Sequence, residues 1–203
     1  MDKTSNKILK NLNNKKFVFI TGNGGSGKTT AAYNLKSKLE SLGKIVNVIS
    51  MDDFLTENKL RDNVLQEFEA DGKKHSYRYS ACCKESYFLR GLIATLVNLN
   101  NKNNSLVINK KGEQITLFGN ADLHIVEGIG TVFIPNEEYN IEALKVWLEC
   151  DRETILKHRN IRDLEYFKSG IEKHHDERTL QYVANIEVHK PEFDLIIDVS
   201  QKK

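Results

Sequence analysis

A short glycine-rich segment, GNGGSGKT at residues 22–29, carries the residue types that bind phosphate. It fits the spacing G-x-x-x-x-G-K-[ST], in which glycines let successive backbone N–H groups turn towards phosphate oxygens. The lysine of this pattern reaches the β- and γ-phosphates of a nucleoside triphosphate, and the hydroxyl after it holds Mg²⁺. The sequence therefore predicts a nucleotide-phosphate site made by Gly22, Asn23, Gly24, Gly25, Ser26, Gly27, Lys28, Thr29 and Thr30.

Three carboxylates lie where apolar runs end. Asp52 and Asp53 follow the run at 44–50, and Glu127 comes near the end of the run at 123–128. Any one of these acids alone would be interpreted as a helix cap or a solvated strand end. In a doubly wound sheet, however, ligands bind beyond the carboxyl ends of the strands, so all three should share a crevice with the phosphate loop. We expect Asp52 to orient an acceptor hydroxyl and take its proton, and Thr29, Glu127 and Asp52 to hold Mg²⁺.

Elements that could position these residues alternate along the chain. Short runs that are apolar on both faces predict buried parallel strands, and the helical patterns between them predict helices on each side of the sheet. The predicted strands are 16–22, 44–50, 123–128, 143–150 and 193–199, and the predicted helices are 29–43, 84–99, 152–168 and 176–188. Two alternating runs around NKKG predict a β-hairpin at 105–118.

The same patterns set the expected organisation of the chain. No repeat, low-complexity tract or linker divides it, so we predict a single domain over residues 1–203. Residues 1–15 are expected to be a loose arm or a short helix. The hairpin is expected to be an insertion, and a lid is expected over 152–175.

Composition limits the class of protein. Of the 203 residues, 39% are hydrophobic and 29% are charged, which is typical of a soluble globular chain. The net charge of +2 provides no broad field for nucleic acid or anionic lipid. The first residues lack the apolar core of a signal peptide, no run approaches a membrane span, and the three cysteines are an odd number. We therefore expect a cytoplasmic protein with neither a membrane nor a nucleic-acid partner.

The absence of certain motifs excludes several classes of nucleotide-binding protein. A GTPase should carry N-K-x-D to recognise guanine, and no Asn-Lys pair in the chain is followed by Asp at the required position. Transporter-type and helicase-type motors are longer and carry further signature motifs. A short chain with one phosphate loop favours a small-molecule kinase that uses ATP and Mg²⁺, although the choice between ATP and GTP stays open.

Four motifs in order also carry a family resemblance. GNGGSGKT, ISMDDF, IVEGI and RNIRD follow the order and approximate spacing of the uridine kinase and phosphoribulokinase-like group of P-loop kinases, and bacterial pantothenate kinase is similar. The resemblance implies a three-layer α/β/α P-loop NTPase fold with a mainly parallel five-stranded sheet and a helical lid. It also implies that Asp52 is the base with Asp53 in support, that Glu127 is associated with the metal, and that Arg159 and Arg162 close over the phosphates.

The sequence departs from this group where the acceptor should be recognised. Uridine kinases carry P-D-A-F-D after the base, whereas residues 55–80 contain no proline. Asp53, Phe54, Tyr77, Arg78 and Tyr79 could contact an acceptor, but the tyrosines could equally pack at the start of a helix.

This departure leaves alternatives open. One is a nucleotide sensor or partner-binding protein without kinase activity, and another is a kinase that acts on a protein or a nucleic-acid end. The sequence does not identify a small-molecule acceptor, which could be a nucleoside or a pantothenate-like alcohol. It also does not give the oligomeric state, and a homodimer is one possibility.

Overall fold

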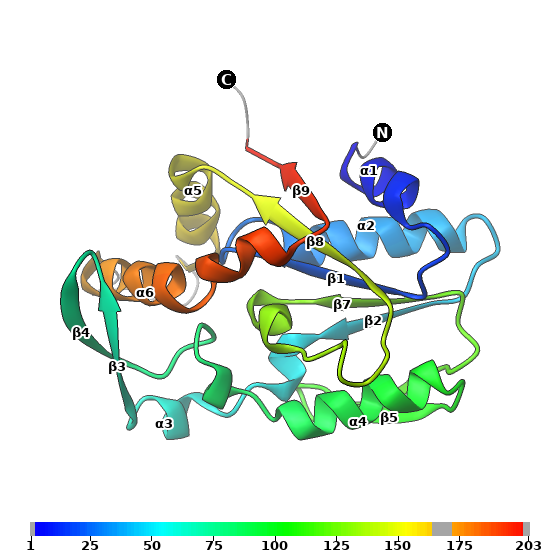
Figure 1. Ribbon diagram of the computed structural model, residues 1–203, viewed down its shortest axis with the longest axis horizontal. Coiled ribbons are helices and arrows are strands. Elements are labelled where there is room, and N and C mark those ends of the chain that lie inside the picture. Colours follow the sequence, from blue (N-terminus) through cyan, green and yellow to red (C-terminus); the bar gives the residue numbers. More distant parts are fainter. Residues whose placement is uncertain (1–2, 164–171, 201–203) are drawn as a thin grey trace.

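A five-stranded parallel sheet forms the centre of the molecule (Figure 1). The computed structural model describes residues 3–163 and 172–200, with the side chains of 160–176 left out of the description. The strand order is β2-β7-β1-β8-β9. The strands are β1 (Phe17–Gly22), β2 (Val46–Ser50), β7 (Leu123–Glu127), β8 (Ala143–Glu149) and β9 (Leu195–Asp198). The predicted parallel sheet is therefore confirmed.

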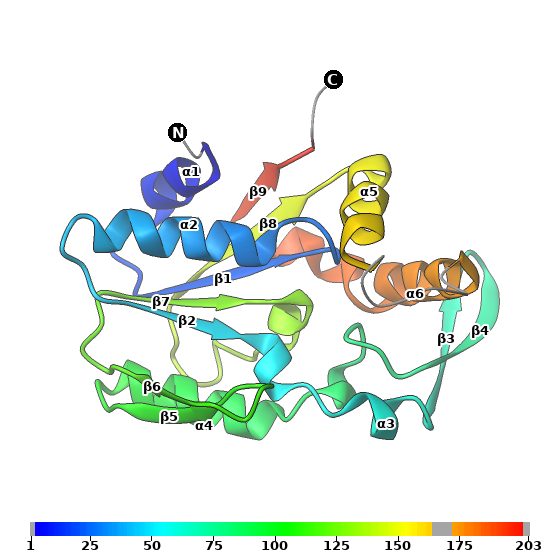
Figure 2. The same ribbon diagram turned by 180° about the vertical axis from the view of Figure 1, so that it is seen from behind.

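Helices cover both faces of this sheet, as the alternation in β1 illustrates. Val18 and Ile20 pack into a core with α2 (Lys28–Glu40) and with Ile8 of α1 (Lys3–Asn11). Phe17 and Phe19 pack on the opposite face, in a core that includes α4 (Leu89–Asn100). Figure 2 shows α1 and α2 on one side of the strands and α4 on the other. The three-layer α/β/α architecture is confirmed, and the N-terminal segment contains the short helix rather than a loose arm.

Two hairpins extend from the layers. The first, β5 (Ser105–Ile108) with β6 (Gln114–Leu117), is antiparallel and lies where the sequence predicted a hairpin. The second, β3 (Leu65–Ala70) with β4 (Lys73–Arg78), was not predicted. Its turn is Asp71–Gly72, and both residues have positive φ, 50° and 69°. This geometry suits an Asp-Gly hairpin turn, so the tyrosines of this region do not start a helix.

Two helices near the carboxyl ends of the strands complete the fold: α5 (Arg152–Asp163) and α6 (Glu172–Asn185). Leu180 and Ala184 of α6 pack against Phe68, Ala70 and Tyr77 of the β3–β4 hairpin. Part of the expected lid, 164–171, and the side chain of Arg162 lie outside the described residues. A one-turn helix, α3 (Asn58–Arg61), and 3₁₀ turns at Met51–Phe54, Lys84–Ser86, Ile129–Phe133 and Glu187–Glu192 connect the elements.

Several predicted helix boundaries differ from the structure: α2 ends at Glu40 rather than at 43, and α6 begins at Glu172 rather than at 176. The segment predicted to be helical from 84 begins with a 3₁₀ turn, and α4 itself starts at Leu89. The last helix ends at Asn185 rather than at 188, because Glu187 begins a 3₁₀ segment that contains Pro191. No helix in the described ranges has the length and apolar character needed to cross a bilayer.

Candidate functional site

The phosphate loop joins β1 to α2 with glycines at the positions that need them. Gly27 caps the N-terminus of α2 with φ 80°. Gly22 has φ +143°, and a Cβ there would lie 2.4 Å from the carbonyl oxygen of Leu148 in the neighbouring strand. The buried Ser26 hydroxyl has no hydrogen-bond partner within the described part of the chain. An unpaired buried hydroxyl beside backbone N–H groups and a helix N-terminus fits a site built for phosphate oxygens.

Lys28 lies inside this loop and is partly buried. Its Nζ donates to the carbonyl oxygen of Asn23 at 2.9 Å. Burial lowers the pKa of Lys28 to about 8, although the carboxylates of Glu127 and Asp52 oppose that change. The ammonium group is therefore held at a desolvation cost in the position where a phosphate would stabilise its charge.

Glu127 is the last residue of β7, which lies between β2 and β1 in the sheet. The segments that follow β2 and β1 carry Asp52 and the phosphate loop. The Glu127 carboxylate accepts hydrogen bonds from Thr29 Oγ1 at 3.2 Å and from Ser50 Oγ at 3.0 Å. Burial raises the pKa of Glu127, and the charge of Lys28 opposes this shift. One carboxylate with two hydroxyls is a set of hard oxygen donors. Such a set fits Mg²⁺, which proteins bind through one or two carboxylates together with nucleotide phosphates.

The two adjacent acids at the end of β2 face different partners. Asp52 belongs to the cavity lining, and its carboxylate lies 3.7 Å from Lys110 Nζ in the turn of the β5–β6 hairpin. Asp53 accepts a hydrogen bond from the backbone N–H of Lys110 at 3.0 Å. Phe54 is buried in the hydrophobic core with 9% of its surface exposed. Asp52 thus faces the cavity, whereas Asp53 and Phe54, both predicted to contact substrate, lie outside its lining.

A cavity of about 590 Å³ joins these groups. One wall is the phosphate loop from Gly24 to Thr30, with Glu127 and Asp52 beside it. The opposite wall comes from residues 55–81 and includes three residues that the sequence indicated, Tyr77, Arg78 and Tyr79. The same lining contains Arg61 and Arg178, which sequence reasoning did not single out. The volume is in the usual range for small-molecule sites.

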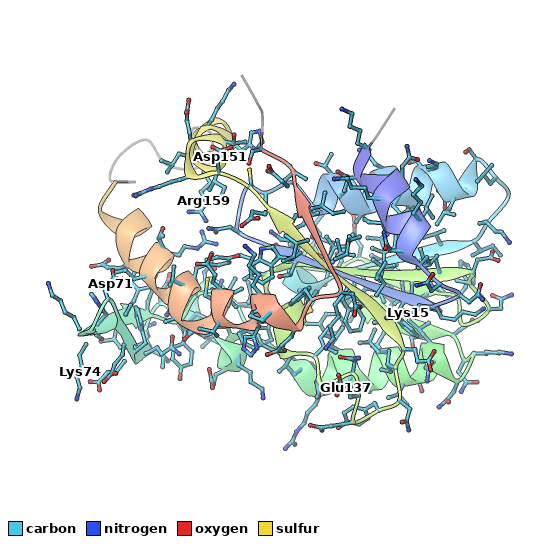
Figure 3. All side chains as sticks on the ribbon, turned by 45° about the horizontal axis from the view of Figure 1, so that its top comes forward. Lys15, Asp71, Lys74, Glu137, Asp151 and Arg159 are labelled. Atoms are coloured by element: carbon cyan, nitrogen blue, oxygen red, sulfur yellow. The ribbon has the colours of Figure 1, made fainter. Side chains whose placement is uncertain are left out.

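Arg159 extends from helix α5 (Figure 3). It contacts the phosphate loop. Its Nε donates to the carbonyl oxygen of Gly24 at 2.9 Å, and its Nη2 donates to Asn23 Oδ1 at 2.7 Å. His158 Nδ1 lies 2.8 Å from the carbonyl oxygen of Gly25. Arg159 lines a second cavity, of about 200 Å³, rather than the larger one. In this arrangement the arginine holds the loop in place, and the predicted contact with phosphates remains untested.

Comparisons with known proteins place the chain in a family. The profile of the family described as Novel STAND NTPase 3 matches residues 1–108, which is more than half of the 203 residues. The chain belongs to this family. The matched part contains the phosphate loop and Asp52, and it ends in β5 before Glu127. No curated protein matches the chain by sequence.

Solved structures of small-molecule kinases share the fold of this Novel STAND NTPase 3 member. A possible uridine kinase from Bacillus stearothermophilus is 17% identical with a TM-score of 0.57, covering 96% of this chain and 97% of that one. Shikimate kinase from Acinetobacter baumannii is 18% identical with a TM-score of 0.51, covering 95% and 88%. D-glycerate 3-kinase from Cryptococcus neoformans is 14% identical with a TM-score of 0.52, covering 91% and 84%. At these identities the likeness establishes a P-loop NTPase fold of the kinase-like type.

Proposed function

We propose that this protein is a kinase that transfers the γ-phosphoryl group of ATP to a hydroxyl of a small molecule. One observation carries the proposal. Asp52 lines the same cavity as Lys28, Thr29 and Glu127, and that cavity continues past the phosphate loop to the wall formed by residues 55–81. A protein that only bound nucleotide would not need a carboxylate and a second polar wall beyond the triphosphate site.

Each group has a defined task in this scheme. The charge of Lys28 stabilises the β- and γ-phosphates, and Thr29 and Glu127 would hold Mg²⁺. When bound, Mg²⁺ neutralises charge that develops on the transferring phosphoryl group. Asp52 orients the acceptor hydroxyl and removes its proton, and its half-exposed carboxylate is accessible for this role. Positioning and charge neutralisation account for most of the catalysis.

The resemblance and the comparisons together support one class of acceptor. The motif order of the chain resembles that of uridine kinases and pantothenate kinase. The similar structures are named as a possible uridine kinase, a shikimate kinase and a D-glycerate 3-kinase, and uridine, shikimate and D-glycerate all carry hydroxyl groups. These points support a small alcohol as acceptor, such as a nucleoside or a pantothenate-like compound.

A second function is favoured by the family match. The matched family is described as an NTPase, and its profile spans the phosphate loop without reaching Glu127. The protein could therefore hydrolyse or sense nucleotide without a phosphoryl acceptor. The two functions differ in the role of Asp52. A sensor should bind ATP equally well with Asn at this position, and no alcohol should stimulate its turnover.

The test measures ADP release from Mg-ATP and Mg-GTP in the presence of nucleosides, pantothenate, sugars and hydroxy acids. Asp52→Asn protein is measured in parallel, with Asp53→Asn as the matched control because Asp53 lies outside the cavity lining. The kinase proposal predicts acceptor-dependent release that falls at least about a hundredfold in Asp52→Asn. It is contradicted if no acceptor stimulates the wild type while both proteins bind ATP alike.

A further inference from the structure

One arginine in the cavity has no partner in the described part of the chain. Arg178 comes from α6 and lines the same cavity as Lys28 and Asp52. Its Nε is buried and has no hydrogen-bond partner within the described residues. A buried Nε–H group without an acceptor is unfavourable, because it loses water without gaining a hydrogen bond. A ligand that supplies an acceptor would remove this cost.

The other two arginines of the lining are already bound to the protein. Arg61 donates to the carbonyl oxygens of Thr56 at 2.7 Å and of Tyr79 at 3.5 Å. Arg78 forms an ion pair with Asp62 and donates to Tyr77 Oη at 3.4 Å. Both therefore serve to hold the segment 56–79 together. Among the three arginines of the lining, Arg178 is the one whose N–H donors are available to a ligand in the cavity.

The position of Arg178 is fixed on the wall opposite the phosphate loop. Three residues along the same helix, Gln181 donates to Gln66 Oε1 at 2.9 Å and to the carbonyl oxygen of Arg78 at 3.3 Å. These bonds join α6 to both strands of the β3–β4 hairpin. The charge of Arg178 also contributes to lowering the pKa of Lys28 across the cavity. Arg178 therefore belongs to the acceptor wall, and its charge acts on the side where phosphoryl transfer would occur.

We propose that Arg178 binds a carboxylate or phosphate group carried by the phosphoryl acceptor, so that the substrate is an anionic hydroxy compound rather than a neutral alcohol. This inference rests on the proposed kinase function. Guanidinium groups bind both anions through two parallel N–H···O bonds, so the structure supports the shared chemistry of the two groups. The anion would fix one end of the acceptor at Arg178 and leave its hydroxyl free to reach Asp52.

The experiment measures binding and does not depend on turnover. The protein is first saturated with Mg²⁺ and a non-hydrolysable ATP analogue, so that added anions cannot occupy the phosphate loop. Calorimetric titration then compares anionic and neutral partners: D-glycerate with glycerol, pantothenate with pantothenol, and uridine monophosphate with uridine. The first two pairs test a carboxylate, and the third tests a phosphate. The proteins are wild type, Arg178→Gln, Arg178→Lys and the control Arg90→Gln, which removes an exposed arginine from α4.

We expect at least one anion to bind wild type more tightly than its neutral partner. Arg178→Gln should weaken that binding about tenfold or more, because it removes charge-assisted hydrogen bonds. Arg178→Lys should recover part of the loss, and Arg90→Gln should bind as wild type does. Because Arg178 makes no bond within the described protein, its variants should unfold at the same denaturant concentration as wild type.

Three results would overturn the inference. In the first, no anion of the panel binds. In the second, anions bind wild type and Arg178→Gln with the same affinity. In the third, Arg178→Gln loses affinity for the ATP analogue and not for the acceptor. The last result would assign Arg178 to the γ-phosphate. Anion binding that depends on Arg178, without phosphoryl transfer in any assay, would refute the kinase proposal while leaving the anion site in place.

Discussion

Replacement of Arg159 by Ala separates two roles for this side chain, one in holding the phosphate loop and one in phosphoryl transfer. The side chain is buried, with 4% of its surface exposed, and donates two hydrogen bonds to residues of the loop. A hydrogen bond to a charged group contributes roughly 1.5–3 kcal/mol. Asn23 Oδ1 keeps a second donor, the N–H of Gly24 at 2.7 Å, so the low end of that range applies. Two such bonds give a loss of about 3 kcal/mol in the free energy of unfolding.

Urea denaturation without nucleotide measures this loss. The single tryptophan, Trp147, is buried with 3% of its surface exposed and should report unfolding by fluorescence. Lys157→Ala is the matched control, because it removes an exposed cation from the same helix. If Arg159→Ala unfolds at the same urea concentration as wild type and loses only turnover, the loop-holding role deduced from the contacts is wrong.

Two further predictions concern the nucleotide site. The pKa of Lys28 is lowered to about 8, and only the charged form attracts phosphate, so ATP affinity should fall as the pH rises above 8, by up to about tenfold per pH unit. Lys28→Arg should remove this dependence, because arginine keeps its proton; affinities measured from pH 7 to 9.5 that decline equally in both proteins would count against the assignment. Glu127→Gln should reduce the gain in nucleotide affinity on adding Mg²⁺ by about tenfold or more, since the carboxylate charge is lost while the side-chain shape is kept. An unchanged gain in titrations with and without Mg²⁺ would remove Glu127 from the metal site.

Much of the nucleotide site could be predicted from the sequence, because its residues are close together in the chain or end neighbouring strands. The phosphate loop depends on local spacing between a strand and a helix. Ser50 and Glu127 are paired in register between β2 and β7, so topology alone brings these strand ends together. A parallel sheet with short apolar strands therefore positions the acids without any knowledge of side-chain packing.

The acceptor wall was harder to predict, since it depends on contacts between distant segments. The β3–β4 hairpin has an Asp-Gly turn and alternating residues, and these are local sequence signals of a hairpin. Arg178 carries no such signal, because it reaches the cavity only when α6 packs on that hairpin. Phe54 shows a difference of the opposite kind: the sequence predicts a substrate contact for this aromatic residue beside a candidate base, whereas in the structure its ring packs in the core.

The destination of the γ-phosphoryl group tests the central claim most directly. Phosphorus NMR of a reaction with Mg-ATP and the acceptor panel distinguishes a phosphate ester from inorganic phosphate. The account predicts a new phosphate ester whose formation requires both an acceptor and Asp52. Release of inorganic phosphate alone, at a rate that neither the acceptors nor Asp52→Asn changes, would contradict the kinase proposal and support nucleotide hydrolysis.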